Sequence, residues 1–332
     1  MSKEAINQQI REMIAKANRI VVVSHIRPDG DAVGSLLGLG NALIEAGKEV
    51  QLILQDGVPG SFRHLPSSDK VTRRITSEYD LAIVVDCSDM IRTGGVLGER
   101  QPDINIDHHI TNLNFATINC VYPEAVATSV ILANNLSDWG FKITPAVAKP
   151  LLTGLVSDTL GFRTANVTPG DLRVAANLME DGATNLSDLY QRALNRRSFE
   201  GIRYWGQGLS KIQRQGKLVY TVLSISDRAS AGYNGNDDAD LINVIQNVED
   251  SDIAMILVEQ HGGKVKISWR AQPGIDVSAL ALSFGGGGHP AAAGCEISGN
   301  LEEVQAKVLK ATLKVLENNH NGSTNGTQRN QH

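Results

Sequence analysis

The chain has few cysteines, no excess of positive charge and no long apolar run. Cys87, Cys120 and Cys295 are odd in number and scattered among 332 residues without CxxC spacing. Such a set excludes a disulfide framework or a structural zinc site and indicates reduced thiols. A formal net charge of −5 provides no overall basic field for gripping long nucleic acid. A short nucleotide is not excluded, because metals and a few local arginines can hold its phosphates.

No apolar stretch approaches the roughly 20 residues that are needed to cross a bilayer. The N-terminal stretch 2–17 is polar and unlike a signal peptide. We therefore expect a soluble, cytoplasmic protein without a membrane partner. With 42% hydrophobic residues, the chain is long enough for two domains.

The first half of the chain alternates strand patterns with helix patterns. This alternation predicts an α/β fold with a doubly wound, mainly parallel sheet. Thr168 is expected to cap a further helix that has Pro169 at its first position. The expected strands are 20–25, 49–54 and those that end at Asp86 and Asp107, and the expected helices are 32–46, 123–139 and 144–160.

The second half predicts a smaller α/β domain. Residues 253–258 and 265–269 should pair as a hairpin, and the glycine run 285–288 should be a loop before a last helix at 301–316. A further strand at 218–223 and a helix near 240–248 are expected. We predict four segments: a metal-binding catalytic domain (1–186), a basic helical connector (187–215), a substrate-binding domain (216–318) and a disordered tail (319–332).

Polar residues follow three of the apolar strand patterns. His25 ends the first, Asp86 ends the second, and Asp107, His108 and His109 end the third. Because the carboxyl ends of parallel strands meet at one edge of a sheet, these residues predict one polar site there. Taken alone, an aspartate such as Asp86 at the end of a strand is more typical of a helix cap or a loop residue. Taken together, the polar residues at the three strand ends favour a metal site.

Two further segments supply carboxylates. Asp29 and Asp31 flank Gly30 in a tight turn just past the first strand, and Asp158 lies late in an apolar helix. So many carboxylates in one place would resist ionising unless divalent cations compensate them. Oxygen and imidazole ligands without sulfur favour Mn²⁺ or Mg²⁺. A two-metal site of this kind suits hydrolysis of a phosphoester.

The ordered set His25-x3-Asp29-x-Asp31, Asp86, Asp107-His108-His109 and Asp158 resembles the four motifs of the DHH phosphoesterase family. The second half resembles the DHH-associated C-terminal domain through Ser268-Trp269-Arg270 and the segment 285–294. The resemblance covers about residues 15–318. It is closest to the two-domain branch that combines oligoribonuclease activity with 3′-phosphoadenosine-5′-phosphate (pAp) phosphatase activity.

The resemblance implies two divalent metal ions, Mn²⁺ preferred, with Mg²⁺ or Co²⁺ as alternatives. It assigns His25, Asp29 and Asp86 to one ion and Asp31, Asp86, His108 and Asp158 to the other. Asp107 would orient the histidine pair. His109 would face the substrate phosphate as a proton donor or electrostatic stabiliser.

Substrate-binding residues are expected in both halves. The glycine run allows its backbone N–H groups to approach a phosphate, and Arg270 suits a clamp for a second phosphate. Trp269 should face the core. The expected substrate-binding residues are Ser268, Arg270, Gly286, Gly287, Gly288, His289 and, less specifically, Arg163.

The leading hypothesis is a phosphoesterase that acts on short RNA oligonucleotides and on pAp, with an active-site cleft between the domains. A cyclic or linear dinucleotide (c-di-AMP or pApA) phosphodiesterase is the nearest alternative, and a metal-stabilised nucleotide sensor is the non-enzymatic one. The GGGGHP loop counts against an inorganic pyrophosphatase. A RecJ-like processive exonuclease normally needs additional nucleic-acid-binding modules. The sequence shows no such module, which counts against that activity and against binding of long duplexes. A homodimer is expected from the resemblance alone.

Overall fold

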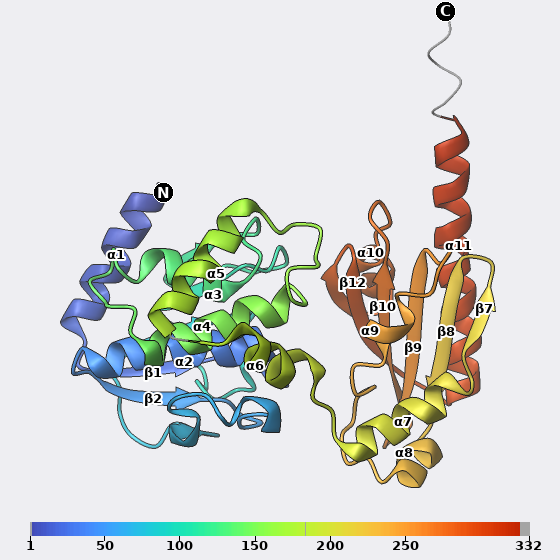
Figure 1. The fold of residues 1–332 in the computed structure, drawn as a ribbon, viewed down its shortest axis with the longest axis horizontal. Coiled ribbons are helices and arrows are strands. Elements are labelled where there is room, and N and C mark those ends of the chain that lie inside the picture. The colour runs from blue at the N-terminus through green and yellow to red at the C-terminus, as the bar shows by residue number, and fades with distance from the viewer. Residues whose placement is uncertain (1, 183, 326–332) are drawn as a thin grey trace, which may run out of the picture. The chain divides into compact units, whose positions relative to one another are not determined.

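The computed structural model describes residues 2–182 and 184–325 and divides the chain into two compact units, 1–196 and 197–332 (Figure 1). No helix in the described part is long and apolar enough to cross a membrane. All three cysteines are buried and unpaired.

The first unit is built on a parallel sheet of six strands in the order β3-β2-β1-β4-β5-β6. This confirms the predicted parallel α/β fold. Its strands are β1 (Arg19–Val23), β2 (Glu49–Ile53), β3 (Val71–Thr72), β4 (Leu81–Val85), β5 (Ile104–Asp107) and β6 (Ile118–Val121). Its α-helices are α1 (Lys3–Lys16), α2 (Gly30–Glu45), α3 (Thr128–Asn135), α4 (Pro145–Asp158), α5 (Pro169–Gly182) and α6 (Leu186–Tyr190).

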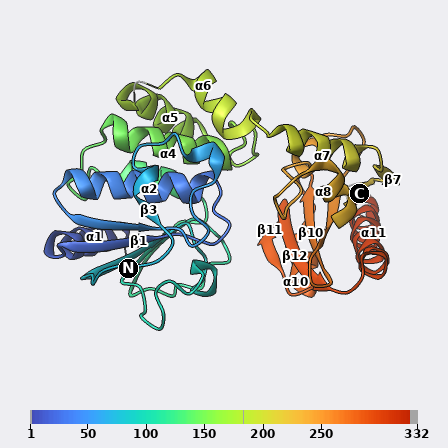
Figure 2. The same cartoon turned by 90° about the horizontal axis from the view of Figure 1, so that it is seen from below.

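The two faces of this sheet are covered differently. Side chains of one face, such as Val22 and Ile83, join a core with α2, α3, α4 and α5, and Figure 2 shows α2, α4 and α5 stacked on one side of the sheet. The other face, with Val21 and Val84, packs against irregular segments that include Tyr79 and Met90. The alternation of strand and helix patterns did not reveal this difference.

One predicted helix begins later than the pattern suggested. The helix expected from residue 123 starts at Thr128, because residues 123–127 form a turn that leads into α3. The strands β3 and β6 were missed, since one has two residues and the other, Ile118–Val121, alternates buried with half-buried positions. The helix expected after Thr168 is present as α5.

The second unit has a mixed sheet in the order β11-β12-β10-β9-β8-β7. Only β8 and β9 pair in parallel, and the expected hairpin is formed by β9 and β10. Its strands are β7 (Gln213–Gln215), β8 (Leu218–Leu223), β9 (Ile253–Gln260), β10 (Lys264–Ala271), β11 (Gly287–His289) and β12 (Ala292–Ser298). Its α-helices are α7 (Phe199–Leu209), α8 (Ile225–Ala231), α9 (Ile242–Ile245), α10 (Ser278–Ser283) and α11 (Leu301–Asn325).

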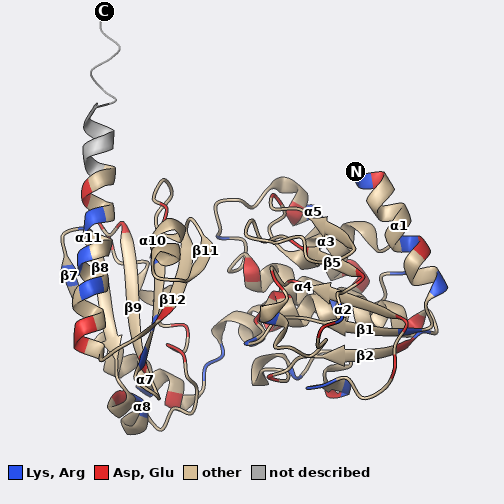
Figure 3. Ribbon diagram, turned by 180° about the vertical axis from the view of Figure 1, so that it is seen from behind, with Lys and Arg blue, Asp and Glu red and all other residues tan. Residues whose placement is uncertain are grey.

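Alternate residues of this sheet face two cores. Trp269 is fully buried on the side of α10 and α11, as predicted, whereas Ile256 packs on the side of α7, α8 and α9. Figure 3 shows the contrast in charge: Lys, Arg, Asp and Glu lie along α11 and α1, whereas β8 is tan.

Several details of the second half differ from the expectations, and β7, β12, α8 and α10 were not predicted. Part of the glycine run is a short strand, β11, because it pairs with β12. The helix expected near 240–248 is limited to α9 and a turn. Helix α11 continues to Asn325, so the expected tail overlaps it, and residues 326–332 lie outside the described residues.

Helices α2 and α4 pack closely because α2 presents glycines to α4. A Cβ on Gly30 would lie 2.1 Å from Ser157 Oγ, and one on Gly34 would lie 2.5 Å from the Pro150 carbonyl oxygen. Gly38 meets Leu151 in the same way. The spacing of four residues keeps these glycines on one helix face. The beginning of α2 is thereby held beside the end of α4.

We predict that Gly34→Ala destabilises the protein by about 1–3 kcal/mol, since the added methyl group overlaps backbone atoms of α4. Chemical denaturation of the full chain measures the loss. Gly206→Ala in α7 is the control: its Cβ has no atom within 4 Å, so helix propensity should stabilise that variant by about 0.5–1 kcal/mol. Equal stability of Gly34→Ala and the parent chain would contradict this account of the contact.

Candidate metal centre

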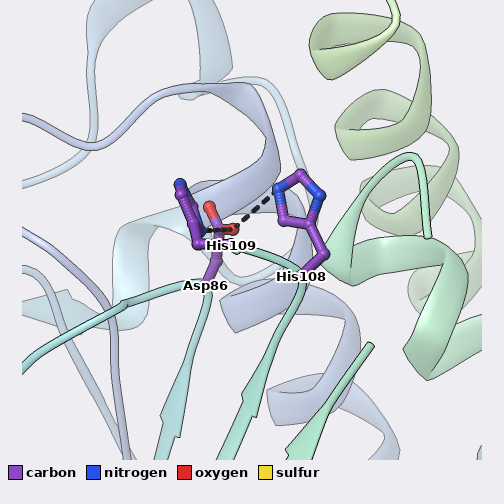
Figure 4. A group of neighbouring side chains, drawn as sticks. All are labelled: Asp86, His108 and His109. Atoms are coloured by element: carbon purple, nitrogen blue, oxygen red, sulfur yellow. Dashed lines mark ion pairs between the residues drawn. The ribbon is translucent and has the colours of Figure 1, made fainter. Parts of the chain in front are cut away.

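Asp86 lies at the centre of the polar cluster, one residue beyond β4. Its backbone has a φ of 53°, a left-handed conformation that side chains seldom adopt. Its Oδ2 lies 3.6 Å from His25 Nε2, and its Oδ1 lies 3.7 Å from His108 Nε2. Figure 4 shows the carboxylate between His108 and His109. The two oxygens of one buried carboxylate therefore face histidines from different strands.

The turn after β1 brings in two more of the expected residues. His25 is buried, and its Nδ1 lies 2.8 Å from the Ile26 carbonyl oxygen, so its Nε2 faces Asp86. Asp29 caps α2: its Oδ1 accepts the backbone N–H groups of Asp31 and Ala32. Its Oδ2 is 3.9 Å from His25 Nε2. One carboxylate thus begins the helix and faces the cluster.

Asp31 is held by the N-terminus of α3. The backbone N–H groups of Thr128 and Ser129 donate to its two oxygens at 2.6 and 3.0 Å. The Thr128 hydroxyl donates to Asp86 Oδ1 at 3.0 Å. Thr128 therefore contacts two expected ligands, yet the sequence interpretation missed it. The only signal was its place near the start of a predicted helix.

Asp158 joins the cluster at the end of α4, with its Oδ2 3.5 Å from His108 Nε2. One residue later, beyond Thr159, the three residues Leu160, Gly161 and Phe162 all have positive φ values. The Phe162 N–H donates to the Thr159 hydroxyl and the Tyr190 hydroxyl donates to the Gly161 carbonyl. A strained turn thus fixes the chain immediately after Asp158.

Within the described residues, the possible ligand atoms form three overlapping groups, each with its atoms within 4.8 Å of one another. Asp86 belongs to two of them. The donor set is oxygen and imidazole nitrogen without sulfur, which fits hard or borderline divalent cations. The groups are His25–Asp29–Asp86, Asp31–His108–Asp158 and Asp86–His108–His109.

The pKa values of the carboxyl groups in the cluster are shifted because several charged groups lie close together in a buried site. Burial and the nearby Asp86 charge raise the pKa of Asp31 to about 7. Burial, followed by the charges of Asp31 and Asp29, raises the pKa of Asp158 well above its ordinary value. Burial also opposes ionisation of Asp86, but hydrogen bonding with His25 and the charges of the histidines outweigh it and lower that pKa. The raised pKa values of Asp31 and Asp158 indicate that carboxylate charge exceeds the positive charge of the histidines, an excess that bound cations would offset.

Asp107 and His109 form a pair beside this cluster. Asp107 is fully buried, and its Oδ1 lies 2.7 Å from His109 Nδ1. Burial favours the neutral imidazole, but the Asp107 hydrogen bond and the Asp86 charge outweigh it and raise the pKa of His109. Because an ionised carboxylate only accepts hydrogen bonds, the Nδ1 atom carries the proton.

The expected substrate residues of the second unit share one face of its sheet. On the central strand β12, Ala292 pairs with Arg270 of β10 on one side and with His289 of β11 on the other. Gly294 of β12 pairs in the same way with Ser268 and Gly287. Residues directly opposite in antiparallel strands lie on the same face. Arg270, Ser268, His289 and Gly287 therefore form one surface on adjacent strands.

The other glycines of the run have a packing role. A Cβ on Gly286 would lie 2.2 Å from the Gly294 carbonyl oxygen, and one on Gly288 would lie 2.5 Å from that of Ala292. At Gly287 the same position is open. Arg163 is exposed in the first unit, and its Nε donates to the Leu160 carbonyl at 2.7 Å.

Comparison with known proteins places these residues in a family. Residues 19–155 match the model of the DHH family N-terminal domain, and residues 215–318 match the DHHA1 domain. The first range includes His25 to His109, and Asp158 lies three residues beyond it.

The chain is 35% identical over 301 residues to the bifunctional oligoribonuclease and PAP phosphatase NrnA of Thermus thermophilus, with 90% of each chain covered. It is 23% identical to the probable manganese-dependent inorganic pyrophosphatase of Enterococcus faecalis, over 76% of this chain and 90% of that one. The crystal structure of an exopolyphosphatase-related protein from Bacteroides fragilis superposes with a TM-score of 0.84 at 25% identity, covering 96% and 98%. The chain therefore belongs to the DHH family.

Proposed function

We propose that this chain is a phosphoesterase that hydrolyses short oligoribonucleotides to mononucleotides and removes the 3′-phosphate of pAp. The observation that carries the proposal is the set of overlapping ligand groups around Asp86. The substrates follow from the relative in Thermus thermophilus, whose name gives both activities and whose whole length the chain nearly matches.

The site would hold two divalent cations. His25, Asp29 and Asp86 would bind one, and Asp31, Asp86, His108 and Asp158 would bind the other. Mn²⁺ is preferred because the ligands are carboxylates and imidazoles and because the pyrophosphatase relative is named as manganese-dependent. Bound there, the cations would activate water and neutralise charge on the phosphoryl oxygens.

His109 would transfer the proton. Asp107 holds its Nδ1, so the ring presents Nε2 to the substrate. The raised pKa keeps the imidazole protonated closer to neutral pH. It can therefore donate a proton to the leaving oxygen as the ester bond breaks, which is the role of a general acid.

The second unit would bind the substrate's phosphate or terminal nucleotide. Arg270 and His289 provide side-chain donors on one face of the sheet, and Ser268 lies on the same face. Gly287, with open space at its Cβ position, allows a phosphate to approach the backbone. Gly286, Gly288 and Arg163 remain proposed contributors.

The connector gives little support for binding a longer strand. Most of its cations are engaged within the protein: Arg192 pairs with Asp188, Arg197 with Asp240 and Lys211 with Asp227. Arg203 and Arg214 donate to backbone carbonyls. Cations that are already paired contribute less to attracting a phosphate backbone.

The proposal is tested by incubating the purified protein and Mn²⁺ with pAp, RNA of two to twenty nucleotides, c-di-AMP, pApA and pyrophosphate. We expect turnover of pAp and of RNA up to about five nucleotides, and a sharp fall in activity on longer RNA. This length limit lies at the short end of the ~4–16 nucleotides that dedicated single-strand binding proteins cover. Processive degradation of the 20-mer would indicate a RecJ-like exonuclease. Turnover of c-di-AMP or pApA without pAp would indicate a dinucleotide phosphodiesterase, and binding without turnover would indicate a sensor.

Asp86→Asn should abolish hydrolysis, lowering kcat at least about 10³-fold, because the amide cannot serve as an anionic ligand to both ions. Asparagine is chosen because it tolerates the left-handed backbone at this position. Asp250→Asn, with a φ of 57° at an exposed site, is the matched control and should keep full activity. Retention of a tenth of the activity by Asp86→Asn, with unchanged metal content, would refute the shared-ligand role.

Removal of the metal should make stability depend on pH. The folded-state pKa of Asp31 is about 7 against an ordinary 3.8, so the folded protein binds the proton more tightly than the unfolded chain. Stability then falls as the pH rises from about 4 to 7, and the raised pKa of Asp158 acts in the same direction. We expect the thermal midpoint in EDTA to fall over this range and Mn²⁺ to restore it. A midpoint in EDTA that rises with pH would contradict the assigned charges.

Arg270→Ala should lower kcat/KM by an amount equivalent to about 1.5–3 kcal/mol, the scale of one hydrogen bond to a charged group. Metal content should stay at that of the parent chain. Lys264→Ala, at the other end of β10 and paired with Glu296, is the control and should behave as wild type. Loss of bound metal from Arg270→Ala would exclude a role confined to phosphate binding.

A further inference from the structure

The side-chain amide of Asn112 lies beside the Asp107–His109 pair. Its Nδ2 is 2.6 Å from Asp107 Oδ2, 2.8 Å from Asn105 Oδ1 and 3.3 Å from the Cys87 carbonyl oxygen. Its Oδ1 accepts the backbone N–H of Asn114 at 2.7 Å. The two N–H groups of the amide serve the nearer acceptors, Asp107 and Asn105. Reversing the amide would place its oxygen against these acceptors and its NH₂ group against the Asn114 N–H, so only one orientation fits.

The contacts of Asp107 show what this amide does. One carboxylate oxygen, Oδ1, lies 2.7 Å from His109 Nδ1 and accepts the backbone N–H of His108 at 2.9 Å. The other oxygen accepts from Asn112. Rotation of the carboxylate would break these bonds together, and Asp107 is fully buried, away from replacement by bulk water. Asn112 therefore fixes the direction in which Asp107 presents Oδ1 to the imidazole.

Through Asn105, the side-chain amide of Asn112 is connected to the backbone around Asp86. Asn105 is fully buried on β5, and its Nδ2 lies 3.3 Å from the Val84 carbonyl oxygen and 3.2 Å from that of Cys87. These carbonyls come two residues before and one residue after Asp86. The network thus ties the loop after the histidines to the backbone on both sides of Asp86.

We propose that Asn112 is a positioning residue that acts through Asp107 on His109. The proposal rests on the proposed function in that His109 transfers a proton to the substrate. Asn112 makes no proton transfer itself. It holds the Asp107 carboxylate so that the His109 ring keeps one orientation, with its Nδ1–H directed at Asp107 and its Nε2 directed to the other side, as neighbouring hydrogen bonds do for catalytic and metal-binding imidazoles.

Asn112→Leu tests the proposal because leucine has nearly the same shape and no donor. We expect kcat to fall by about 10- to 100-fold, the usual effect of removing such a supporting bond. The KM for pAp and the Mn²⁺ content should change by less than about twofold. Asn112→Ala, which removes the same donors without placing an apolar group beside Asp107, is made in parallel in case the leucine variant does not fold.

Asn119→Leu is the matched control. Asn119 lies in the same part of the chain and is also half-buried, but its amide exchanges hydrogen bonds with the Ala116 backbone at 2.8 and 3.1 Å. Its loss should leave kcat within about twofold of the parent chain. An equal fall in both variants would assign the effect of Asn112 to general support of the loop and overturn the proposal.

A second measurement separates the position of the ring from its chemistry. In the Mg²⁺-loaded protein, NMR of the imidazole nitrogens and their protons should show a protected His109 Nδ1–H in the parent chain and in Asn119→Leu. The signal should be lost or shifted in the Asn112 variants, and an unchanged signal would overturn the proposal. A changed signal with unchanged kcat would support the positioning of His109 and reject its proposed proton transfer.

Discussion

The arrangement of the first unit depends on keeping several carboxyl groups close together where water is scarce. Asp31 and Asp86 are buried, and Asp158 lies near them, so their charges repel one another. Donors offset part of this repulsion: α3 directs two backbone N–H groups at Asp31, and the Thr128 hydroxyl contacts Asp86. These donors fix the carboxylates before any cation binds, which limits the reorganisation that binding requires.

The close contact of α2 and α4 serves the same arrangement. Asp29 and Asp31 come from the beginning of α2, and Asp158 is the last residue of α4. Only glycines on α2 allow the antiparallel helices to approach until these ends meet, because a Cβ on Gly34 would overlap the backbone of α4. The position of the carboxylates in the polar site therefore depends on the packing of α2 against α4.

Much of the first sheet and the positions of its strand-end residues could be predicted from the sequence. Apolar runs that stop on His25, Asp86 and Asp107 are a strong signal, because parallel strands bring those ends to one edge. The sequence did not reveal Thr128 or Asn112. Both belong to irregular segments or lie at their ends, where no periodicity marks which polar side chain turns inward. Glycines spaced by four along α2 are a sequence signal for the close approach of α4, because each leaves space for that helix.

The left-handed backbone at Asp86 has a consequence for protein design. A scaffold that receives this site must provide more than suitable positions for side chains. It must end a buried strand in a conformation that costs energy for most residues, and it must retain the hydrogen bond from the Asp86 N–H to the Ile106 carbonyl. Grafting the ligands onto a regular strand end would turn the central carboxylate away from one group of its partners. The transferable unit is the pair of neighbouring strands together with the bend, and the ligand list alone is insufficient.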